Sequence, residues 1–315
     1  MIQKKYKLHS SPLYRIRSIH VLAKLLLIDP RSLRRVEEYA KSNPKKAYHV
    51  FLQEPKKREI QQPVHPLLVL IHKRMKEFLS QIETPTYLFS SKRGLSYIDN
   101  ARMHISANYL QTMDINKFYA STRAEAVFQF FLYDLEMASD LARMLTNLCT
   151  YDSYKIPTGS SISQILAFWA YHRVFDKVND IMESIDISFS LYVDDMTFSS
   201  SHPIPKDLHC KIEEQLKQKW LRFKPCKLHR YFPQDSKTVT GCIITQDHRL
   251  EAPNALKAKA IKGLQVAFAP SKRDGKDLQR ALGITQSIQQ IDSSIFKESH
   301  RRLKREIQLL RKANG

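Results

Sequence analysis

Residues 189–200, FSLYVDDMTFSS, place two adjacent aspartates between two segments in which apolar and polar residues alternate. Alternation with a period of two is typical of a half-buried strand, because successive side chains point to opposite faces. The stretch therefore predicts a β-hairpin with Asp194 and Asp195 at or beside its tip. Two such carboxylates repel each other unless a cation lies between them, and Mg²⁺ suits them because it prefers oxygen ligands. A simple acidic turn is the alternative, since Asp is common in turns.

The charge balance of the chain limits the classes of partner that it is expected to bind. A formal net charge of +20 favours a polyanion, with nucleic acid first and a membrane surface second. No apolar run reaches the length of a membrane-spanning helix, and the N-terminus lacks the apolar segment of a signal peptide, so we expect no membrane partner. The four cysteines are widely spaced, which supports neither a zinc site nor a disulfide framework. We interpret them as buried thiols of a cytoplasmic protein.

Both ends of the chain are basic and have apolar residues at helical spacing. Residues 1–66 contain fifteen Lys or Arg against five Asp or Glu, and residues 251–315 contain fourteen against six. Near the N-terminus a break between two helices is expected at Asp29–Pro30, with Ser32 as the cap of the second helix. The C-terminal segments 255–268 and 293–315 predict helices with one basic face, suited to a sugar-phosphate backbone. Whether the N-terminal helices contact RNA or a protein stays open.

Several short motifs give the chain a family resemblance. Tyr192-Val193-Asp194-Asp195 resembles the metal-binding Tyr-x-Asp-Asp turn of reverse transcriptases. Other motifs follow that family's order: Arg-x-Ile-x-x-Pro at 58–63, Asn-Ala-x-x-His at 100–104, Asp-x-x-x-Phe-Tyr at 114–119, Pro-Thr-Gly at 157–159 and Val-Thr-Gly at 239–241. Two of these motifs, Asn-Ala-x-x-His and Val-Thr-Gly, resemble motifs of its retron branch. On these motifs the chain is identified as a member of the bacterial retron-type reverse transcriptases, with the resemblance covering about residues 50–245.

The resemblance implies an α+β fold of the right-hand polymerase type, with fingers, an antiparallel-sheet palm and a helical thumb. Residues 1–105 would form the N-terminal helices and fingers. Residues 106–245 would form the palm with an interleaved fingers segment, which is the reverse transcriptase domain. Residues 246–315 would form the basic helical thumb.

The resemblance also implies the catalytic groups. Asp114, Asp194 and Asp195, with the backbone of Ile115, would bind two Mg²⁺ ions, an arrangement suited to in-line phosphoryl transfer. Asp114 lies 80 residues before Asp194, so only a folded sheet could bring them together. Lys227 falls where the family has a lysine thought to protonate the departing pyrophosphate.

A second set of residues is implied to bind the incoming nucleotide. Arg58 and Lys56 would face its triphosphate, since basic side chains bind phosphate oxygens well. Tyr119 falls at the family's steric gate, where an aromatic ring excludes a ribose 2′-hydroxyl. Thr158, Gly159 and Tyr192 would complete this site, with Gly159 allowing close backbone approach. Thr158 replaces the glutamine usual in the family. We assign no chemical role to His104.

The function implied is that of an RNA-directed DNA polymerase of a retron. Such enzymes copy part of a structured non-coding RNA into msDNA, a branched RNA–DNA molecule, and act with an effector or toxin protein in defence against phage. The partners expected are therefore the cognate RNA, the msDNA product, dNTPs and an effector. One alternative is a group II intron-type reverse transcriptase, which the Asn-Ala-x-x-His motif disfavours. The other is a non-catalytic msDNA-binding scaffold that restrains a toxin, which the three aspartates disfavour.

Overall fold

The computed structural model describes residues 5–55, 57–269 and 275–313. The chain divides into two compact units, each assembled from separate stretches. Unit 1 comprises Met1–Gly94, Met113–Met196 and Pro205–Leu228, and unit 2 comprises Leu95–Thr112, Thr197–Ile204 and His229–Gly315. These units are discontinuous, whereas the expected fingers, palm and thumb are consecutive segments. The boundaries expected at residues 105 and 245 stay a prediction.

Unit 1 is mainly helical, and its central element is the long helix α9 (Ser163–Glu183). Helix α9 contacts helices α4, α6, α7 and α10 and strand β4. Phe168 and Trp169 are buried in it, and the Phe168 ring stacks on Phe175 with centroids 6.2 Å apart. These aromatic side chains therefore belong to the core of unit 1. The other helices of unit 1 are α1 (Ile19–Leu26), α2 (Pro30–Ser42), α3 (Pro44–Ala47), α4 (Pro66–Gln81), α6 (Phe118–Ser121), α7 (Ala124–Gln129), a π-helical turn (Phe130–Asp134), α8 (Ser139–Cys149), α10 (Leu208–Lys217) and the 3-10 turns Leu8–Ser10 and Pro225–Lys227.

The break between α1 and α2 lies where the sequence predicts it, but the capping residue differs. The carboxylate of Asp29 accepts the backbone N–H of Ser32 at 2.9 Å, and Pro30 is the first helical residue. The prediction of Ser32 as the cap is therefore wrong. Proline suits the first helical position because it has no N–H to leave unpaired, which makes the preceding Asp29 the natural cap.

Strands β1 (Tyr48–Gln53) and β2 (Arg58–Pro63) form an antiparallel hairpin in unit 1. A separate four-stranded sheet has the order β4-β5-β3-β6. Its strands are β4 (Ser188–Tyr192), β5 (Asp195–Ser200), β3 (Tyr109–Asp114) and β6 (His229–Tyr231), and the chain passes between the two units within β3 and within β5.

The predicted acidic hairpin is present as β4 and β5, with Val193 and Asp194 in its turn. The prediction of one solvent-facing side is wrong, however. Ser190, Thr197 and Ser199 on the polar face are all buried, at 0%, 1% and 3% exposure. Their small hydroxyl side chains allow both faces of the strands to be covered, because each hydroxyl can be hydrogen-bonded where it is buried.

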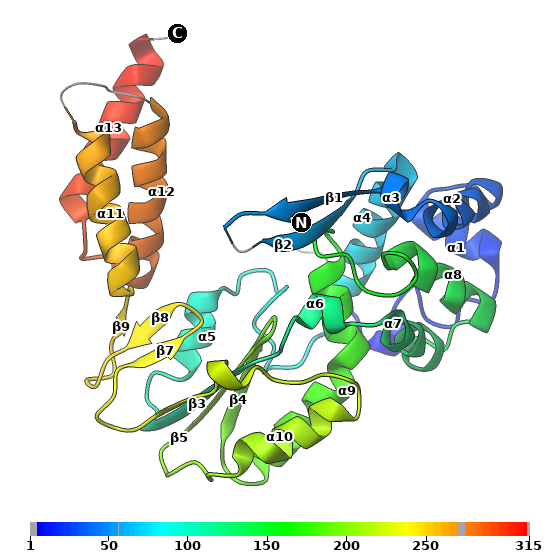
Figure 1. Cartoon of the computed structure of the whole chain (residues 1–315), viewed down its shortest axis with the longest axis horizontal. Coiled ribbons are helices and arrows are strands. Elements are labelled where there is room, and N and C mark those ends of the chain that lie inside the picture. Colours follow the sequence, from blue (N-terminus) through cyan, green and yellow to red (C-terminus); the bar gives the residue numbers. More distant parts are fainter. Residues whose placement is uncertain (1–4, 56, 270–274, 314–315) are drawn as a thin grey trace. The chain divides into compact units, whose positions relative to one another are not determined.

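Unit 2 combines a small antiparallel sheet with helices. The sheet contains β7 (Lys237–Val239), β8 (Cys242–Ile244) and β9 (Leu250–Glu251). The helices are α5 (Tyr97–Met103), α11 (Asn254–Ala267), α12 (Gly275–Ile291) and α13 (Lys297–Ala313), of which the last three lie side by side (Figure 1). Their common core includes Leu278, Ala281 and Leu303. The sequence predicts helices near α11 and α13 but does not single out α12.

Two motifs of the retron branch meet in unit 2. Asn100 Nδ2 donates to Thr240 Oγ1 at 3.5 Å, and Thr240 Oγ1 donates to the carbonyl of Tyr97 at 2.8 Å. His104 is fully buried, its Nδ1 lies 2.6 Å from Ser199 Oγ, and burial lowers its pKa to about 3. The Asn-Ala-x-x-His and Val-Thr-Gly motifs therefore hold α5 and the turn after β7 together, with a neutral histidine in the core.

Cys149 and Cys242 are buried free thiols, whereas Cys210 and Cys226 are exposed. The prediction of four buried thiols is therefore wrong for the latter two, which lie on α10 and in the following 3-10 turn, where one side faces solvent. Within the described ranges, no helix combines the length and the apolar character needed to cross a membrane.

Candidate active site

The tip of the acidic hairpin has an unusual backbone that is fixed from both sides. Val193 has a φ of +61°, a left-handed conformation that costs a β-branched residue about 1–2 kcal/mol. Its N–H donates to Ser90 Oγ at 3.1 Å. On the other side, the carbonyl of Asp194 accepts the N–H of Ile115 at 2.9 Å. These two hydrogen bonds fix the turn that carries Asp194 and Asp195.

The bond from Ile115 also brings Asp114, the last residue of β3, to the hairpin. Burial raises the pKa of Asp194, and the charge of Asp114 raises it further. Burial, then Asp194 and then Asp114, raise the pKa of Asp195 to about 6. The three aspartates therefore lie within electrostatic reach of one another, although Asp114 comes from a distant part of the sequence.

The chemistry of these three groups fits a hard divalent cation. Partly buried carboxylates that repel one another gain from a shared positive charge, and oxygen is the ligand that Mg²⁺ prefers. Among the residues that the structure describes, no group of three His, Cys, Asp or Glu side chains is arranged so that it could hold a metal ion by itself. Mg²⁺ is usually held by one or two carboxylates together with water and substrate phosphates, so an open set of carboxylates is in keeping with it. The assignment of Asp114, Ile115, Asp194 and Asp195 as ligands stays a prediction.

Two cations face the carboxylates. The charges of Arg58 and Lys227 lower the pKa of Asp194, against the stronger effects of burial and Asp114. The Arg58 guanidinium lies over the Tyr119 ring, 5.7 Å from its centroid. Burial and then the charge of Asp194 raise the pKa of Tyr119 to about 12. The structure thus brings Arg58, Tyr119 and Lys227 around the acidic group.

Tyr192 and Lys56 are also predicted to bind the nucleotide. Tyr192 precedes the turn, and its pKa is raised by burial and then by the charge of Asp195. Lys56 lies outside the described residues. Its predicted contact with a triphosphate stays a prediction.

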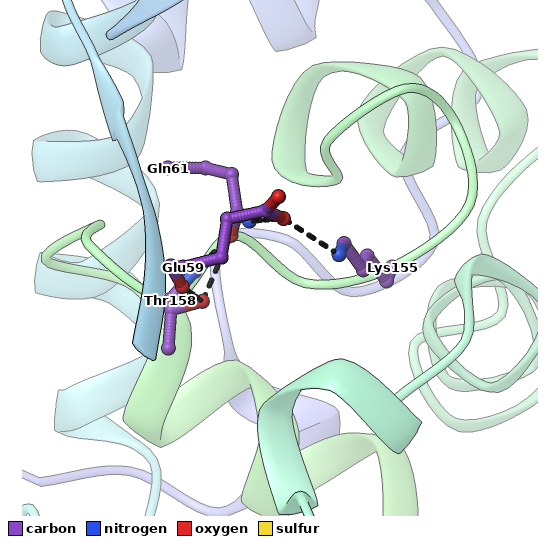
Figure 2. A network of polar contacts seen from close by, with 4 residues as sticks. All are labelled: Glu59, Gln61, Lys155 and Thr158. Carbon is purple, nitrogen blue, oxygen red and sulfur yellow. Dashed lines mark hydrogen bonds and ion pairs between the residues drawn. The ribbon is translucent and has the colours of Figure 1, made fainter. Parts of the chain in front are cut away.

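Thr158 and Gly159 pack against strand β2. The Thr158 hydroxyl donates to Gln61 Oε1 at 2.8 Å, and Gln61 Nε2 donates to Glu59, which also pairs with Lys155 (Figure 2). The N–H of Gly159 donates to the carbonyl of Gln61 at 3.0 Å. A Cβ on Gly159 would lie 2.7 Å from Ile60 Cγ2, closer than such atoms approach. It would also lie 3.0 Å from the carbonyl oxygen of Gln61, so the close packing against the side chain and backbone of strand β2 favours glycine here. The predicted nucleotide contacts of Thr158 and Gly159 stay a prediction.

Sequence reasoning missed a basic cavity in unit 1. Its volume is about 1120 Å³, and it lies between α4, the loop after Phe89 and the start of α9. Burial and then the charge of Lys5 lower the pKa of Lys92, so two ammonium groups crowd this space. The charged side chains that line it are five cations and one carboxylate: Lys5, Lys73, Lys76, Lys92, Arg93 and Glu77. Only the fold assembles them, and the general excess of Lys and Arg gives no signal of the place.

Comparison with known proteins decides the family. Residues 56–244, more than half of the chain, match the family described as reverse transcriptase (RNA-dependent DNA polymerase). The chain belongs to the reverse transcriptase family. Its curated relatives include the Retron Ec86 reverse transcriptase of Escherichia coli, 24% identical over 98% of this chain and 94% of the relative. The Retron Se72 reverse transcriptase of Salmonella heidelberg is 28% identical over 50% of this chain, and the Retron Ec83 reverse transcriptase of Escherichia coli 22% identical over 61%.

These matches confirm the coarser predictions. Reverse transcriptases have the right-hand polymerase fold, and the helices and antiparallel strands observed here agree with it, so the α+β fold class is confirmed. The retron-type resemblance and the assignment to RNA-directed DNA polymerases are confirmed as well. The matches span 41% of the Se72 enzyme and 65% of the Ec83 enzyme, so the products and partners of the whole protein belong to the proposal below.

Proposed function

We propose that this reverse transcriptase copies part of a cognate structured RNA into msDNA, and that Asp114, Asp194 and Asp195 are its catalytic carboxylates. The observation that carries the proposal is their convergence: the charge of Asp114 raises the pKa of both Asp194 and Asp195. Three partly buried carboxylates in mutual repulsion make a poor structural element and a good binding site for cations.

In this proposal the three carboxylates and the Ile115 carbonyl would hold two Mg²⁺ ions. When bound, the ions would activate the 3′-hydroxyl of the primer and neutralise charge on the departing pyrophosphate. The hydrogen bonds from the Val193 N–H to Ser90 and from the Ile115 N–H to Asp194 orient the carboxylates before substrate binds, so little reorganisation is needed during the reaction. Lys227 donates a proton to the pyrophosphate, and its effect on the pKa of Asp194 and Asp195 supports that placement.

The nucleotide binds between the β1–β2 hairpin and the carboxylates. Arg58 holds phosphate oxygens of the triphosphate, and Lys56 assists it. The Tyr119 ring lies beside the sugar and excludes a 2′-hydroxyl, so dNTPs are selected over rNTPs. The stacking of Arg58 over Tyr119 supports this arrangement, because it keeps the ring in one orientation. Thr158, Gly159 and Tyr192 complete the walls of the site.

The template RNA is bound through its phosphates. The basic cavity offers five cations and one carboxylate, which is the composition expected of a path for a nucleic acid backbone. The basic helices α11 and α13 serve the template–primer duplex in the same way. An effector or toxin that acts with the msDNA in phage defence is the remaining partner.

Expression of the gene with its flanking DNA tests the proposal. Total nucleic acid would be separated on a denaturing gel with and without RNase and debranching enzyme. We expect a discrete short DNA that shortens with RNase and disappears in a strain carrying Asp194→Asn with Asp195→Asn. If the purified protein extends primers on RNA but no such DNA forms, a group II intron-type role replaces the retron role. If msDNA survives the double substitution, the protein is a scaffold for msDNA made elsewhere.

A further inference from the structure

The strained turn of the acidic hairpin depends on a single side chain from a distant segment. Val193 has its φ at +61°, and its N–H donates to the hydroxyl oxygen of Ser90, which lies 103 residues earlier in the sequence. Ser90 is buried, with 4% of its surface exposed. The Val193 N–H is partly buried. Leaving such a donor without an acceptor is unfavourable, so the Ser90 hydroxyl does more than fill space.

The segment that carries Ser90 is itself held rigidly against strand β4. The N–H of Phe89 donates to the carbonyl of Leu191 at 3.0 Å, and the N–H of Leu191 donates to the carbonyl of Tyr87 at 2.8 Å. The Tyr87 hydroxyl donates to Asp176 on α9 at 2.5 Å. The Ser90 hydroxyl therefore continues a short parallel pairing by one further bond, at the point where β4 leaves its regular course.

The opposite side of the turn is held by a different strand. Ile115 donates to the carbonyl of Asp194, so the peptide groups of Val193 and Asp194 are each fixed by one partner. Of these two partners, only Ser90 acts through a side chain. The backbone bond from Ile115 survives any substitution except proline, whereas the Ser90 bond can be removed by changing one oxygen atom.

We propose that Ser90 is a positioning residue that holds the Val193 turn in the conformation in which Asp194 and Asp195 face Asp114. Without its oxygen, Val193 relaxes toward negative φ, which is the conformation that a β-branched residue prefers. The two peptide planes that carry the carboxylates then rotate. This inference rests on the proposed function, since it assigns to Ser90 the geometry of the same carboxylates.

The test compares three substitutions at one position. Ser90→Ala removes the acceptor, Ser90→Cys keeps the volume with a weak acceptor, and Ser90→Thr keeps the hydroxyl. Ser184→Ala is the control for loss of a serine hydroxyl, because the Ser184 hydroxyl donates to the carbonyl of Ile181 at the exposed C-terminal end of α9. Each protein is first compared by thermal melting and by its affinity for an RNA–DNA primer–template.

Three readouts separate positioning from a general loss of stability. For Ser90→Ala we expect faster hydrogen exchange of the Val193 amide, at least tenfold weaker Mn²⁺ binding followed by the loss of the free-ion electron paramagnetic resonance signal, and at least a tenfold lower kcat. The affinity for primer–template should change by less than about twofold. Ser90→Cys should fall between Ala and wild type, and Ser90→Thr should be close to wild type.

The inference is overturned if Val193 exchange, Mn²⁺ affinity and kcat all stay within twofold of wild type in Ser90→Ala, or if Ser90→Thr is no better than Ser90→Ala. Should Ser90→Ala fail to fold, the comparison of Ser90→Cys with Ser90→Thr decides by the same criteria. An inactive wild-type protein would refute the proposed function instead, and the amide-exchange and Mn²⁺ measurements would still decide the role of Ser90.

Discussion

The guanidinium of Arg58 lies over the ring of Tyr119, 5.7 Å from its centroid. Arg58 begins strand β2, and Tyr119 lies on α6, shortly after Asp114. The contact joins the β1–β2 hairpin to the carboxylate group, since the charge of Arg58 lowers the pKa of Asp194 and the charge of Asp194 raises the pKa of Tyr119. A cation above an aromatic face is attracted by the electron density of the ring, which restricts how Tyr119 can turn.

Replacing Tyr119 by Ala should weaken the exclusion of rNTPs. The ring is expected to occupy the space that a 2′-hydroxyl needs, so its removal lowers the preference for dNTPs, by about tenfold or more. The measurement is the ratio of kcat/KM for one dNTP and its rNTP in single-nucleotide extension. Tyr119→Phe keeps the ring and should retain the preference. An unchanged ratio in Tyr119→Ala would refute the gate.

His72 should make stability depend on pH. It is fully buried; its Nε2 donates to the carbonyl of Leu148 at 2.7 Å and its Nδ1 lies 2.6 Å from Ser160 Oγ. Burial lowers its pKa from 6.5 to about 4. Between these pH values the unfolded chain binds the proton and the folded chain does not, so stability falls as pH falls. The slope due to one such histidine is about 1.4 kcal/mol per pH unit.

Denaturant unfolding between pH 7 and pH 4.5 measures this dependence. His72→Gln should flatten the fall in the free energy of unfolding relative to wild type, while the same change at the exposed His20 should leave it unaltered. Because wild type and variant contain the same carboxylates, the difference between their curves removes the contribution of those carboxylates to the pH dependence of the free energy of unfolding. Parallel curves for wild type and His72→Gln would contradict the prediction.

The basic cavity should account for part of the affinity for template RNA. Lys73→Gln, Lys76→Gln and Lys92→Gln together should weaken binding of a template with a single-stranded 5′ extension. They should also lower the slope of log Kd against log salt concentration by up to about three, because each phosphate contact that is lost means that fewer counterions are released on binding. Fluorescence anisotropy across a salt series measures both. The control triple Lys41→Gln, Lys45→Gln and Lys46→Gln, on exposed positions of α2 and α3, should change less. Equal losses would contradict the assignment of the cavity.

Local sequence patterns predict many residues of the candidate site, but fewer of the contacts that position those residues. Alternation predicts the acidic hairpin, and the order of motifs places Asp114 beside it. The burial of both hairpin faces could not be predicted, because serine and threonine occur on exposed and covered strand faces alike. Helix α12 was missed because Gly283 and several polar residues interrupt its apolar pattern. The N-cap of α2, Asp29, could have been predicted, because proline is common at the first position of a helix and Pro30 follows Asp29 directly.

Contacts between segments that lie far apart in the chain could not be predicted from local sequence patterns. The bond of Ser90 to Val193 spans 103 residues, and neither residue is unusual in its local context. The need for glycine at 159 comes from Ile60 and Gln61 on strand β2, about 100 residues earlier. The basic cavity is likewise built from separate stretches, each ordinary by itself.

Primer extension by the purified protein, with and without its carboxylates, tests the central claim most directly. With an RNA template, a DNA primer, dNTPs and Mg²⁺, wild type should extend the primer. Asp194→Asn with Asp195→Asn should reduce the rate by about three orders of magnitude or more. The variant should melt no lower than wild type, because neutral amides avoid both the burial of charge and the mutual repulsion that raise the pKa of these partly buried carboxyl groups. Extension by the folded double variant at the wild-type rate would contradict the assignment of these aspartates as the catalytic centre.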